Sequence, residues 1–327
     1  MNKKTIFSGV QPSGQITIGN YLGALKNWTK LLDEYNCIFA VMDLHSITVR
    51  QDPKTLRENS LNLLAQYIAC GLDPDKCTHF IQSHVPAHAQ LSWVLGCYTY
   101  MGELNRMTQF KEKSQRHADN INAGLYTYPV LMASDILLYN ADLVPVGHDQ
   151  KQHLEIARDI AERFNAIYGD TFTVPDPFIG KVGARIMDLQ DPTKKMSKSE
   201  PNGSISLLED ENAILKKIKK SGTDSLGYVK YEEGRHGINN LLSIYCAVTG
   251  KAVEEAEKDF ECKGYGDFKK AVAEVVIDEL RPVQAKYKEL IENQDYLMSI
   301  INKGASYANE IAQKTLKDVY EKVGFVV

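Results

Sequence analysis

The chain has 327 residues, of which 43% are hydrophobic and 24% charged, and its formal net charge at pH 7 is −4. This length allows two domains, and the composition is that of an ordinary soluble globular protein. The negative charge argues against a protein that coats nucleic acids, but local basic patches could still bind a structured RNA. Two such patches are the lysines of 216–220, which alone are more typical of a solvated helix face, and Arg106, Lys111, Lys113 and Arg116.

No apolar run is long enough to span a membrane, and the basic start is not followed by the apolar stretch of a signal peptide. We therefore expect a cytosolic protein without a membrane partner. The six cysteines form no CxxC pair, and their spacing matches neither a zinc site nor a disulfide framework. We expect reduced and mostly buried thiols at Cys37, Cys70, Cys77, Cys97, Cys246 and Cys262.

The first half of the chain alternates strand-like and helix-like segments. Short apolar runs predict strands at 5–8, 37–42, 79–82 and 141–146. Helical spacing and capping residues predict helices from about 19 to 33, from Asp52-Pro53 to Gly71, over much of 87–110, over 128–139 and around 154–164. Alternation of this kind predicts an α/β domain with a parallel sheet, in which ligands bind at the carboxyl ends of the strands.

The pattern changes after about residue 190. Turn-forming residues bracket a lysine-containing loop at 195–199, and helical stripes dominate beyond it. One stripe runs from Phe268 to Leu280, and Pro282 is expected to end or kink that helix. We predict an α/β catalytic domain over 1–190, followed by a mainly helical domain over 191–327 that begins with the loop.

Two segments point to a nucleotide triphosphate held from two sides. Residues 12–20 are typical of a turn from a strand into a helix, and a helix N-terminus offers free N–H groups and positive potential to phosphate. The sequence Lys195-Met196-Ser197-Lys198-Ser199 places two lysines beside hydroxyls, where they could follow the charge on a leaving pyrophosphate. The first segment alone is also compatible with an ordinary strand–turn–helix that binds no ligand.

Several motifs in a fixed order carry a resemblance to a known family. The chain resembles the bacterial-type tryptophanyl-tRNA synthetases, which are class I aminoacyl-tRNA synthetases, over nearly its whole length. Each motif is weak alone, but their order and spacing are specific: Gln11-Pro12-Ser13-Gly14, Thr17-Ile18-Gly19-Asn20, 107–113, Thr127-Tyr128-Pro129 with 132–135, Gly147-His148-Asp149-Gln150 and the lysine loop. The resemblance implies a Rossmann-like catalytic domain.

For the nucleotide, the resemblance implies catalytic roles for Lys195, Lys198, Lys113, Thr17 and Asn20. This chain has Thr17 and Asn20 where the general class signature has two histidines; both side chains can still donate to a phosphate. Mg²⁺ is expected to arrive with ATP, because we see no dedicated carboxylate cage. The implied ATP-binding residues are Gln11, Pro12, Ser13, Gly19, Asn20, Gly147, His148, Asp149, Ile186, Lys195, Met196, Ser197, Lys198 and Ser199.

For the amino acid, indole offers one N–H donor and no acceptor, so a buried carboxylate is its natural partner. The resemblance points to Asp135 for this contact and to Tyr128 and Gln150 for the polar groups of the substrate. Asp135 could instead be a helix residue paired with a nearby cation, and the apolar residues could be plain core. The remaining implied tryptophan-binding residues are Phe7, His45, Met132, Val144 and Val146.

The implied reaction has two steps: tryptophan and ATP form tryptophanyl-adenylate, and the acyl group then passes to the terminal ribose of tRNA(Trp). Positioning and charge stabilisation suffice for the first step, without an enzyme nucleophile. The resemblance further implies that the helical domain reads the anticodon and that the protein is a homodimer.

Three alternatives stay open. A tyrosine enzyme could use the same aspartate for a phenol, although the apolar residues and the Thr17-Asn20 motif favour tryptophan. A catalytically silent relative would bind tryptophan or ATP only. A metal hydrolase could use His84 and His88 with Asp43, His45, His148 and His153, but Pro86 interrupts the pair and no HExxH motif exists.

Overall fold

The computed structural model describes residues 3–107, 121–146, 151–178 and 184–327. At its centre lies a parallel five-stranded sheet with the strand order β3-β2-β1-β4-β5. Four strands lie close to their predicted positions: β1 (Thr5–Val10), β2 (Asn36–Val41), β3 (Thr78–Ile81) and β4 (Leu143–Pro145). The sequence did not predict β5 (Asp176–Phe178), which contains a proline; at the sheet edge a missing N–H is tolerated.

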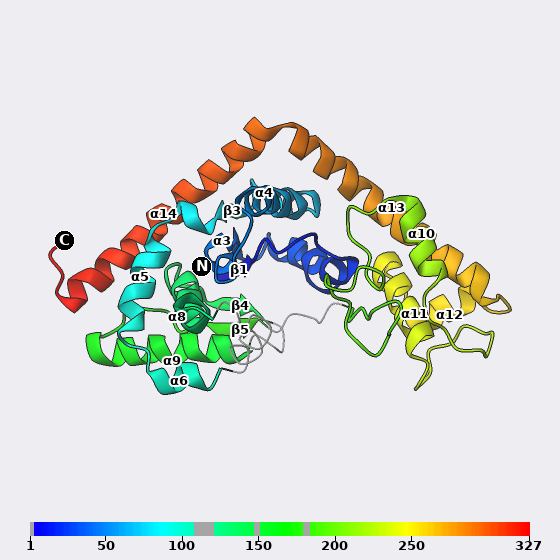
Figure 1. Ribbon diagram of the computed structural model, residues 1–327, viewed down its shortest axis with the longest axis horizontal. Helices are drawn as coiled ribbons and strands as arrows, with labels where there is room; N and C mark the ends of the chain where they lie inside the picture. The colour runs from blue at the N-terminus through cyan, green and yellow to red at the C-terminus, as the bar shows by residue number, and fades with distance from the viewer. Residues whose placement is uncertain (1–2, 108–120, 147–150, 179–183) are drawn as a thin grey trace.

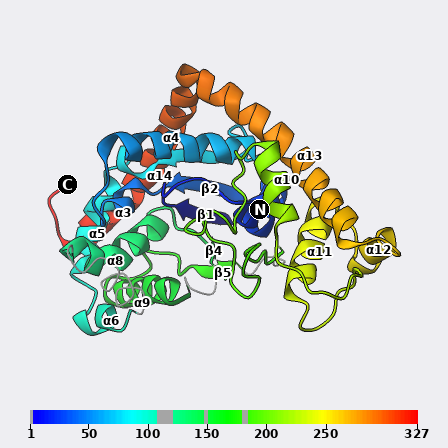
Figure 2. The ribbon, with the colours of Figure 1, turned by 45° about the vertical axis from the view of Figure 1, so that its right-hand side comes forward.

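The side chains of β2 alternate between two hydrophobic cores. Cys37, Phe39 and Val41 belong to one core, and Ile38 and Ala40 to the other. Figure 2 shows the corresponding layers, with α4 (Pro53–Ala69) above the sheet and α8 (Ala123–Leu137) and α9 (Lys151–Tyr168) below it. The continuous apolar run of β2 therefore reflects burial on both faces, as predicted.

Local capping explains where α4 begins and ends. The Asp52 side chain accepts the N–H of Thr55 at 2.8 Å, and Pro53 occupies the first helical turn. Gly71, just past the helix, has a φ of +97°, which favours glycine. These are the residues from which the sequence predicts this helix.

Several other helices of the catalytic domain are short. The predicted helix at 19–33 consists of consecutive segments with different hydrogen-bonding patterns: α1 (Ile18–Asn20), the π-helix η1 (Tyr21–Leu25), α2 (Lys26–Trp28) and the 3₁₀ turn η2 (Thr29–Leu31). The predicted helical region 87–110 contains two separate helices in its described part. These two helices are α5 (Ala87–Gly96) and α6 (Met101–Asn105). Two short elements precede them, α3 (Asp43–Ser46) and the 3₁₀ turn η3 (Gln82–His84).

The segment after the lysine loop is helical, as predicted. It contains α10 (Glu211–Lys219), α11 (His236–Thr249), α12 (Val253–Asp259) and α13 (Tyr265–Glu292), which form the right-hand part of Figure 1. Pro282 lies inside α13 and does not end it. The nearby side chains of Leu280 and Val283 are buried. We attribute the continuous helix to their packing, which outweighs the hydrogen bond lost at Pro282.

The last helix, α14 (Gln294–Val323), returns to the catalytic domain and packs along β3 and α5 (Figure 1). Gly304 permits this approach, because a Cβ at this position would stand 1.8 Å from the carbonyl oxygen of His79. The boundary at 190/191 therefore stays a prediction, since the helical pattern of the C-terminal region serves both domains.

All six cysteines are free, but only two are buried. Cys37 and Cys70 are buried, whereas Cys97 and Cys262 are exposed, so the expectation of mostly buried thiols is wrong. In the described ranges, no helix is both long enough and apolar enough to cross a membrane.

Candidate active site

The turn that leads into α1 closes on itself through Thr17 and Asn20. The Asn20 side-chain oxygen accepts from the Thr17 backbone N–H at 3.2 Å and from the Thr17 hydroxyl at 3.0 Å. The Thr17 hydroxyl in turn accepts the Asn20 backbone N–H at 3.3 Å. Thr17 is buried and its hydroxyl is used in this cap, whereas Asn20 is exposed. Of the two predicted donors, Asn20 is therefore the one whose amide N–H groups can reach a ligand.

The lysine loop lies against this turn. Lys198 donates to the hydroxyl of Ser13 at 3.3 Å, and burial lowers the pKa of Lys198. Met196 is buried, and a Cβ added to Gly19 would stand 3.3 Å from the Met196 Cβ. Lys195 is exposed and forms an antiparallel bridge with Met187. The fold thus brings together two predicted nucleotide segments that are far apart in the sequence.

Other predicted ATP-binding residues also have structural contacts in the described part of the chain. The Ile186 side chain is buried in the core, and its carbonyl accepts the N–H of Met196 at 3.1 Å. Pro12 is also buried, and the carbonyl of Gln11 accepts the N–H of Ser13 at 2.8 Å. Ser197 and Ser199 are exposed and share a hydrogen bond of 2.9 Å. We infer that Ile186 acts through its backbone, as a support for the loop.

A cavity of about 360 Å³ lies between the turn and the loop. Its lining includes Ser13, Thr17 and Lys198, and also Lys217 from α10. Lys217 is paired with Glu209 at 2.5 Å and donates to the carbonyl of Ser204 at 2.8 Å. The neighbouring lysines Lys216, Lys219 and Lys220 are exposed. The sequence gives no sign that Lys217 differs from them by lining the cavity.

The base of the lysine loop is tied to the helical domain. Asn240 on α11 is buried, accepts the N–H of Met187 at 2.8 Å and donates to its carbonyl at 2.9 Å. Gly237 also approaches the backbone closely, since a Cβ there would stand 2.0 Å from the carbonyl oxygen of Gly222. A movement of α11 would therefore move the start of the loop.

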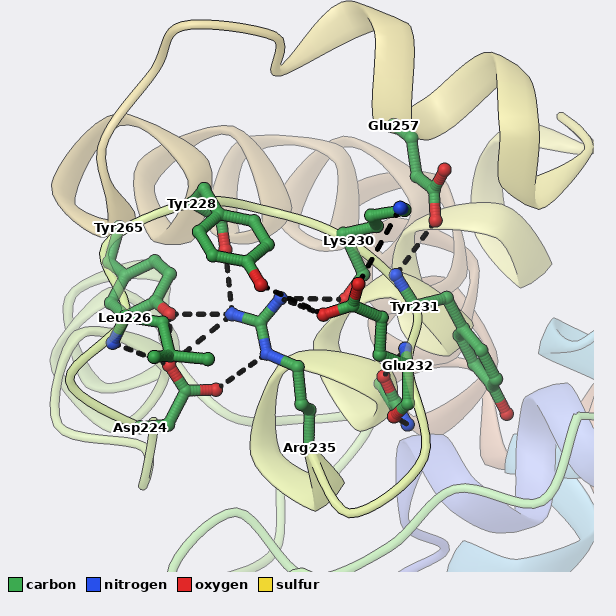
Figure 3. Close-up of polar contacts among 10 residues, drawn as sticks. Asp224, Leu226, Tyr228, Lys230, Tyr231, Glu232, Arg235, Glu257 and Tyr265 are labelled. Atoms are coloured by element: carbon green, nitrogen blue, oxygen red, sulfur yellow. Dashed lines mark hydrogen bonds and ion pairs between the residues drawn. The ribbon is translucent and has the colours of Figure 1, made fainter.

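Beside α11, a buried arginine holds the segment that precedes it (Figure 3). Arg235 donates to both carboxylate oxygens of Asp224, at 2.9 and 3.3 Å, and to the hydroxyl of Tyr265 at 2.8 Å. It also donates to the carbonyls of Tyr228 and Lys230. Hydrogen bonds from Arg235 hold the pKa of Asp224 far below its usual range. The guanidinium therefore fixes 224–235 against α13.

On the other side of the sheet, Asp135 on α8 is fully buried and accepts three hydrogen bonds. Its Oδ2 accepts from His45 Nε2 at 2.7 Å, and its Oδ1 accepts from Gln82 Nε2 and His88 Nδ1, each at 2.6 Å. Burial pushes the pKa of Asp135 up, but His45 and His88 outweigh burial and hold the pKa below its ordinary value. The sequence indicated His45 for this region; Gln82 was missed, and His88 was considered only as a metal ligand.

Apolar and aromatic side chains surround this carboxylate. Phe7 stacks on Tyr139 with the ring centroids 5.3 Å apart. The Tyr128 hydroxyl and His153 Nε2 share a hydrogen bond of 2.6 Å. Burial raises the pKa of Tyr128 to about 12. The Tyr128 ring also lies edge-on to His45, at 6.3 Å between centroids. Of the predicted apolar residues, Phe7 and Val144 belong to one hydrophobic core, and Met132 and Val146 are partly buried and pack against it.

Some predicted residues lie outside the described part of the chain: Lys113, Gly147, His148, Asp149 and Gln150. Another cavity, of about 640 Å³, lies between η3 and α14 and includes His84 but none of the predicted site residues. Within the described ranges, no three His, Cys, Asp or Glu side chains converge as a metal site, so the alternative of a metal hydrolase has no support there.

The family model described as "tRNA synthetases class I (W and Y)" matches residues 1–281. A tryptophan–tRNA ligase of Clostridium tetani is 58% identical over 328 residues, which cover 100% of this chain and 97% of that protein. The crystal structure of tryptophanyl-tRNA synthetase from Mycoplasma pneumoniae has a TM-score of 0.89 and 36% identity, covering 100% of this chain and 99% of its own. The Campylobacter jejuni enzyme, solved in complex with ADP and tryptophan, has a TM-score of 0.86 and 36% identity, covering 98% and 100%.

Proposed function

The chain belongs to the class I tRNA synthetases of the tryptophan and tyrosine type, and we infer that it is a tryptophan–tRNA ligase. The enzyme activates L-tryptophan with ATP and transfers it to tRNA(Trp). The observation that carries this function is the 58% identity to a tryptophan–tRNA ligase over the whole chain. The comparisons favour tryptophan over the tyrosine alternative, since the two solved structures described above, each 36% identical to this chain, are tryptophan enzymes.

We propose that the first step takes place between the turn at 12–20 and the lysine loop. The tryptophan carboxylate attacks the α-phosphorus of ATP, the bond to the β-phosphate oxygen breaks, and pyrophosphate leaves. Lys198 and Lys195 would neutralise the charge that grows on the leaving group, together with Lys113. The contact between Lys198 and Ser13 supports this role, because it sets a cation beside the turn.

Magnesium is proposed as part of the substrate, bound to phosphate oxygens of ATP. The donor set fits this arrangement: Glu209, which lines the cavity, is already paired with Lys217. Magnesium on the phosphates would lower their charge and favour departure of pyrophosphate. The chain itself would contribute lysines and the Asn20 amide, which bind phosphate oxygens directly.

For the amino acid, we propose that the indole N–H donates to Asp135. The Oδ1 atom has two donors, whereas Oδ2 has only His45 within the described residues, so Oδ2 can accept another hydrogen bond. Phe7, Met132, Val144 and Val146 would surround the ring, and Tyr128 and Gln150 would hold the polar end. A pocket that hydrogen-bonds a substrate group rejects analogues that lack the group.

The second step transfers the tryptophanyl group from the adenylate to the terminal ribose hydroxyl of tRNA(Trp), with AMP as the leaving group. We propose that the helical domain binds the anticodon region. The link from Asn240 on α11 to Met187 would then connect tRNA binding with the lysine loop. Because the substrates include tRNA and ATP, we propose that the enzyme acts in the cytosol.

We further propose that the protein is a homodimer. Large apolar side chains on α5 and at the start of α6 support this, because Trp93, Tyr100 and Met101 are 76%, 63% and 65% exposed. Sedimentation equilibrium of the wild type should give a dimer, and Trp93→Lys should shift the mass toward the monomer. A monomeric wild type would contradict the proposal.

Charging of tRNA tests the function as a whole. Transcribed tRNA(Trp) incubated with the protein, ATP, Mg²⁺ and labelled tryptophan should accept tryptophan, and transcribed tRNA(Tyr) with labelled tyrosine should not be charged. Charging of tRNA(Tyr) with tyrosine would overturn the assignment to tryptophan. A protein that binds tryptophan but charges neither tRNA would instead be the silent relative.

A further inference from the structure

Asp135 accepts hydrogen bonds from donors on three separate elements, and its two oxygens have different numbers of donors. His45 on α3 donates to Oδ2, whereas Gln82 in η3 and His88 on α5 both donate to Oδ1. The side chain can rotate only if it gives up at least two charge-assisted hydrogen bonds at once. The carboxylate is therefore fixed with Oδ1 saturated and Oδ2 partly available.

The partner of Oδ2 belongs to the proposed amino-acid site. His45 lies edge-on to Tyr128, and both residues are among those proposed to bind the amino acid. The saturated oxygen is held by Gln82 and His88, which are both fully buried. The oxygen that can accept another hydrogen bond is thus the one beside His45.

His88 is itself held in one orientation. Its Nε2 contacts the hydroxyl of Tyr139 at 2.8 Å, and its carbonyl accepts the hydroxyl of Ser134 at 2.7 Å. The Asp135 carboxylate can only accept, so Nδ1 of His88 carries a proton toward it. The contact with the Tyr139 hydroxyl holds the other ring nitrogen, Nε2, in place. The Tyr139 ring also stacks on Phe7, which links this chain of contacts to the predicted pocket wall.

We propose that three residues behind Asp135 are positioning residues for tryptophan selection: Gln82, His88 and Tyr139. Gln82 and His88 hold the carboxylate in one orientation through their hydrogen bonds to Oδ1, and Tyr139 holds His88, so that Asp135 accepts a substrate N–H. A protonated or rotated carboxyl would offer its own proton to the indole ring, which has no acceptor in the ring plane. This proposal rests on the function inferred above and deepens it.

The test compares tryptophan with an analogue in which sulfur replaces the indole N–H, in ATP–pyrophosphate exchange. The wild type should prefer tryptophan, and Asp135→Asn should remove most of that preference. His88→Leu and Gln82→Met should raise the KM for tryptophan about tenfold, the range for a lost hydrogen bond to a charged group. They should leave the KM for the sulfur analogue and the kcat for both substrates nearly unchanged. Tyr139→Phe removes only a hydroxyl and should have a smaller effect in the same direction.

His79 offers a matched control, because it is another fully buried histidine but is hydrogen-bonded to the carbonyl of Leu72. The hydrogen-bond donors to Asp135 among the described residues are His45, Gln82 and His88 instead. His79→Leu should lower the melting temperature but leave the preference for tryptophan intact. The proposal is overturned if His88→Leu, Gln82→Met and Tyr139→Phe all fold and keep the wild-type preference while Asp135→Asn loses it. If the wild type shows no exchange with tryptophan, the proposed function fails instead, and the two failures are thus distinguished.

Discussion

Met196 packs against Gly19, with its Cβ 3.3 Å from where a Cβ of residue 19 would stand. Through this contact the lysine loop is seated on the turn that begins α1. The absence of a side chain at Gly19 therefore has a second use besides access for a nucleotide: it lets the loop come close enough for Lys198 to reach Ser13.

A larger side chain at this position should displace the loop. We expect Gly19→Val to lower kcat/KM for ATP in the exchange reaction by about tenfold to hundredfold, because a misplacement of about 1 Å has effects of this size. Gly102→Val is the control, since a Cβ on Gly102 meets no atom within 4 Å. Equal activity of the two variants would show that the packing of Met196 on Gly19 does not matter for catalysis.

Loss of a loop lysine should slow activation without affecting amino-acid binding. Lys198→Ala and Lys195→Ala should each reduce the single-turnover rate of adenylate formation by about 100-fold, as expected when a group that stabilises developing charge is removed. Tryptophan affinity, measured by calorimetry, should stay nearly the same. The neighbouring Lys194→Ala serves as control, because Lys194 is exposed and paired with Asp191. A large loss of tryptophan binding in the Lys198 or Lys195 variant would count against the pyrophosphate role.

The alkaline pH dependence should depend on Lys198. Burial lowers its pKa, and only the ammonium form carries the charge that the reaction needs. As the pH rises, the activation rate should therefore begin to fall at a pH below the usual range of lysine titration. In Lys198→Arg the residual rate should persist to higher pH, because a guanidinium stays protonated there. Identical alkaline limbs in both proteins would assign the limb to another group.

Arg235 should matter for stability rather than for chemistry. Arg235→Leu would leave Asp224 without its main partner, and we expect the free energy of unfolding to fall by about 2 kcal/mol. This is less than the roughly 3–5 kcal/mol for a fully buried pair, because the Asp224 side chain is partly exposed. Arg281→Leu breaks exposed contacts to Glu211 and Asp278 and should cost less than about 1 kcal/mol. Urea unfolding measures both. Similar losses in the two variants would mean that the contacts in Figure 3 contribute little.

Local patterns account for the parts of the fold that the sequence predicted well. The start of α4 depends on Asp52, Pro53 and Thr55, which lie within four consecutive residues of the chain. The end of α13 could not be read in the same way, because the packing of Leu280 and Val283 keeps the helix continuous through Pro282. A local rule fails where distant contacts supply the missing stability.

The site residues also divide into those that the local sequence identifies and those that only the fold brings together. Motifs identified Asp135 and Lys198, since their residue types and order are distinctive. The partners of these residues were harder to find: Gln82 lies 53 residues from Asp135, and Lys217 is one of several similar lysines. Only the fold brings such pairs together, so their roles had no signal in a single sequence.

Amino-acid-dependent ATP–pyrophosphate exchange tests the activation of tryptophan most directly, with tryptophan, tyrosine and phenylalanine measured in parallel on the folded wild type with Mg²⁺. We expect strong exchange with tryptophan alone. Exchange with tyrosine at a comparable rate would contradict the selection of an indole N–H by Asp135, and absence of exchange with all three amino acids would contradict the proposed catalysis.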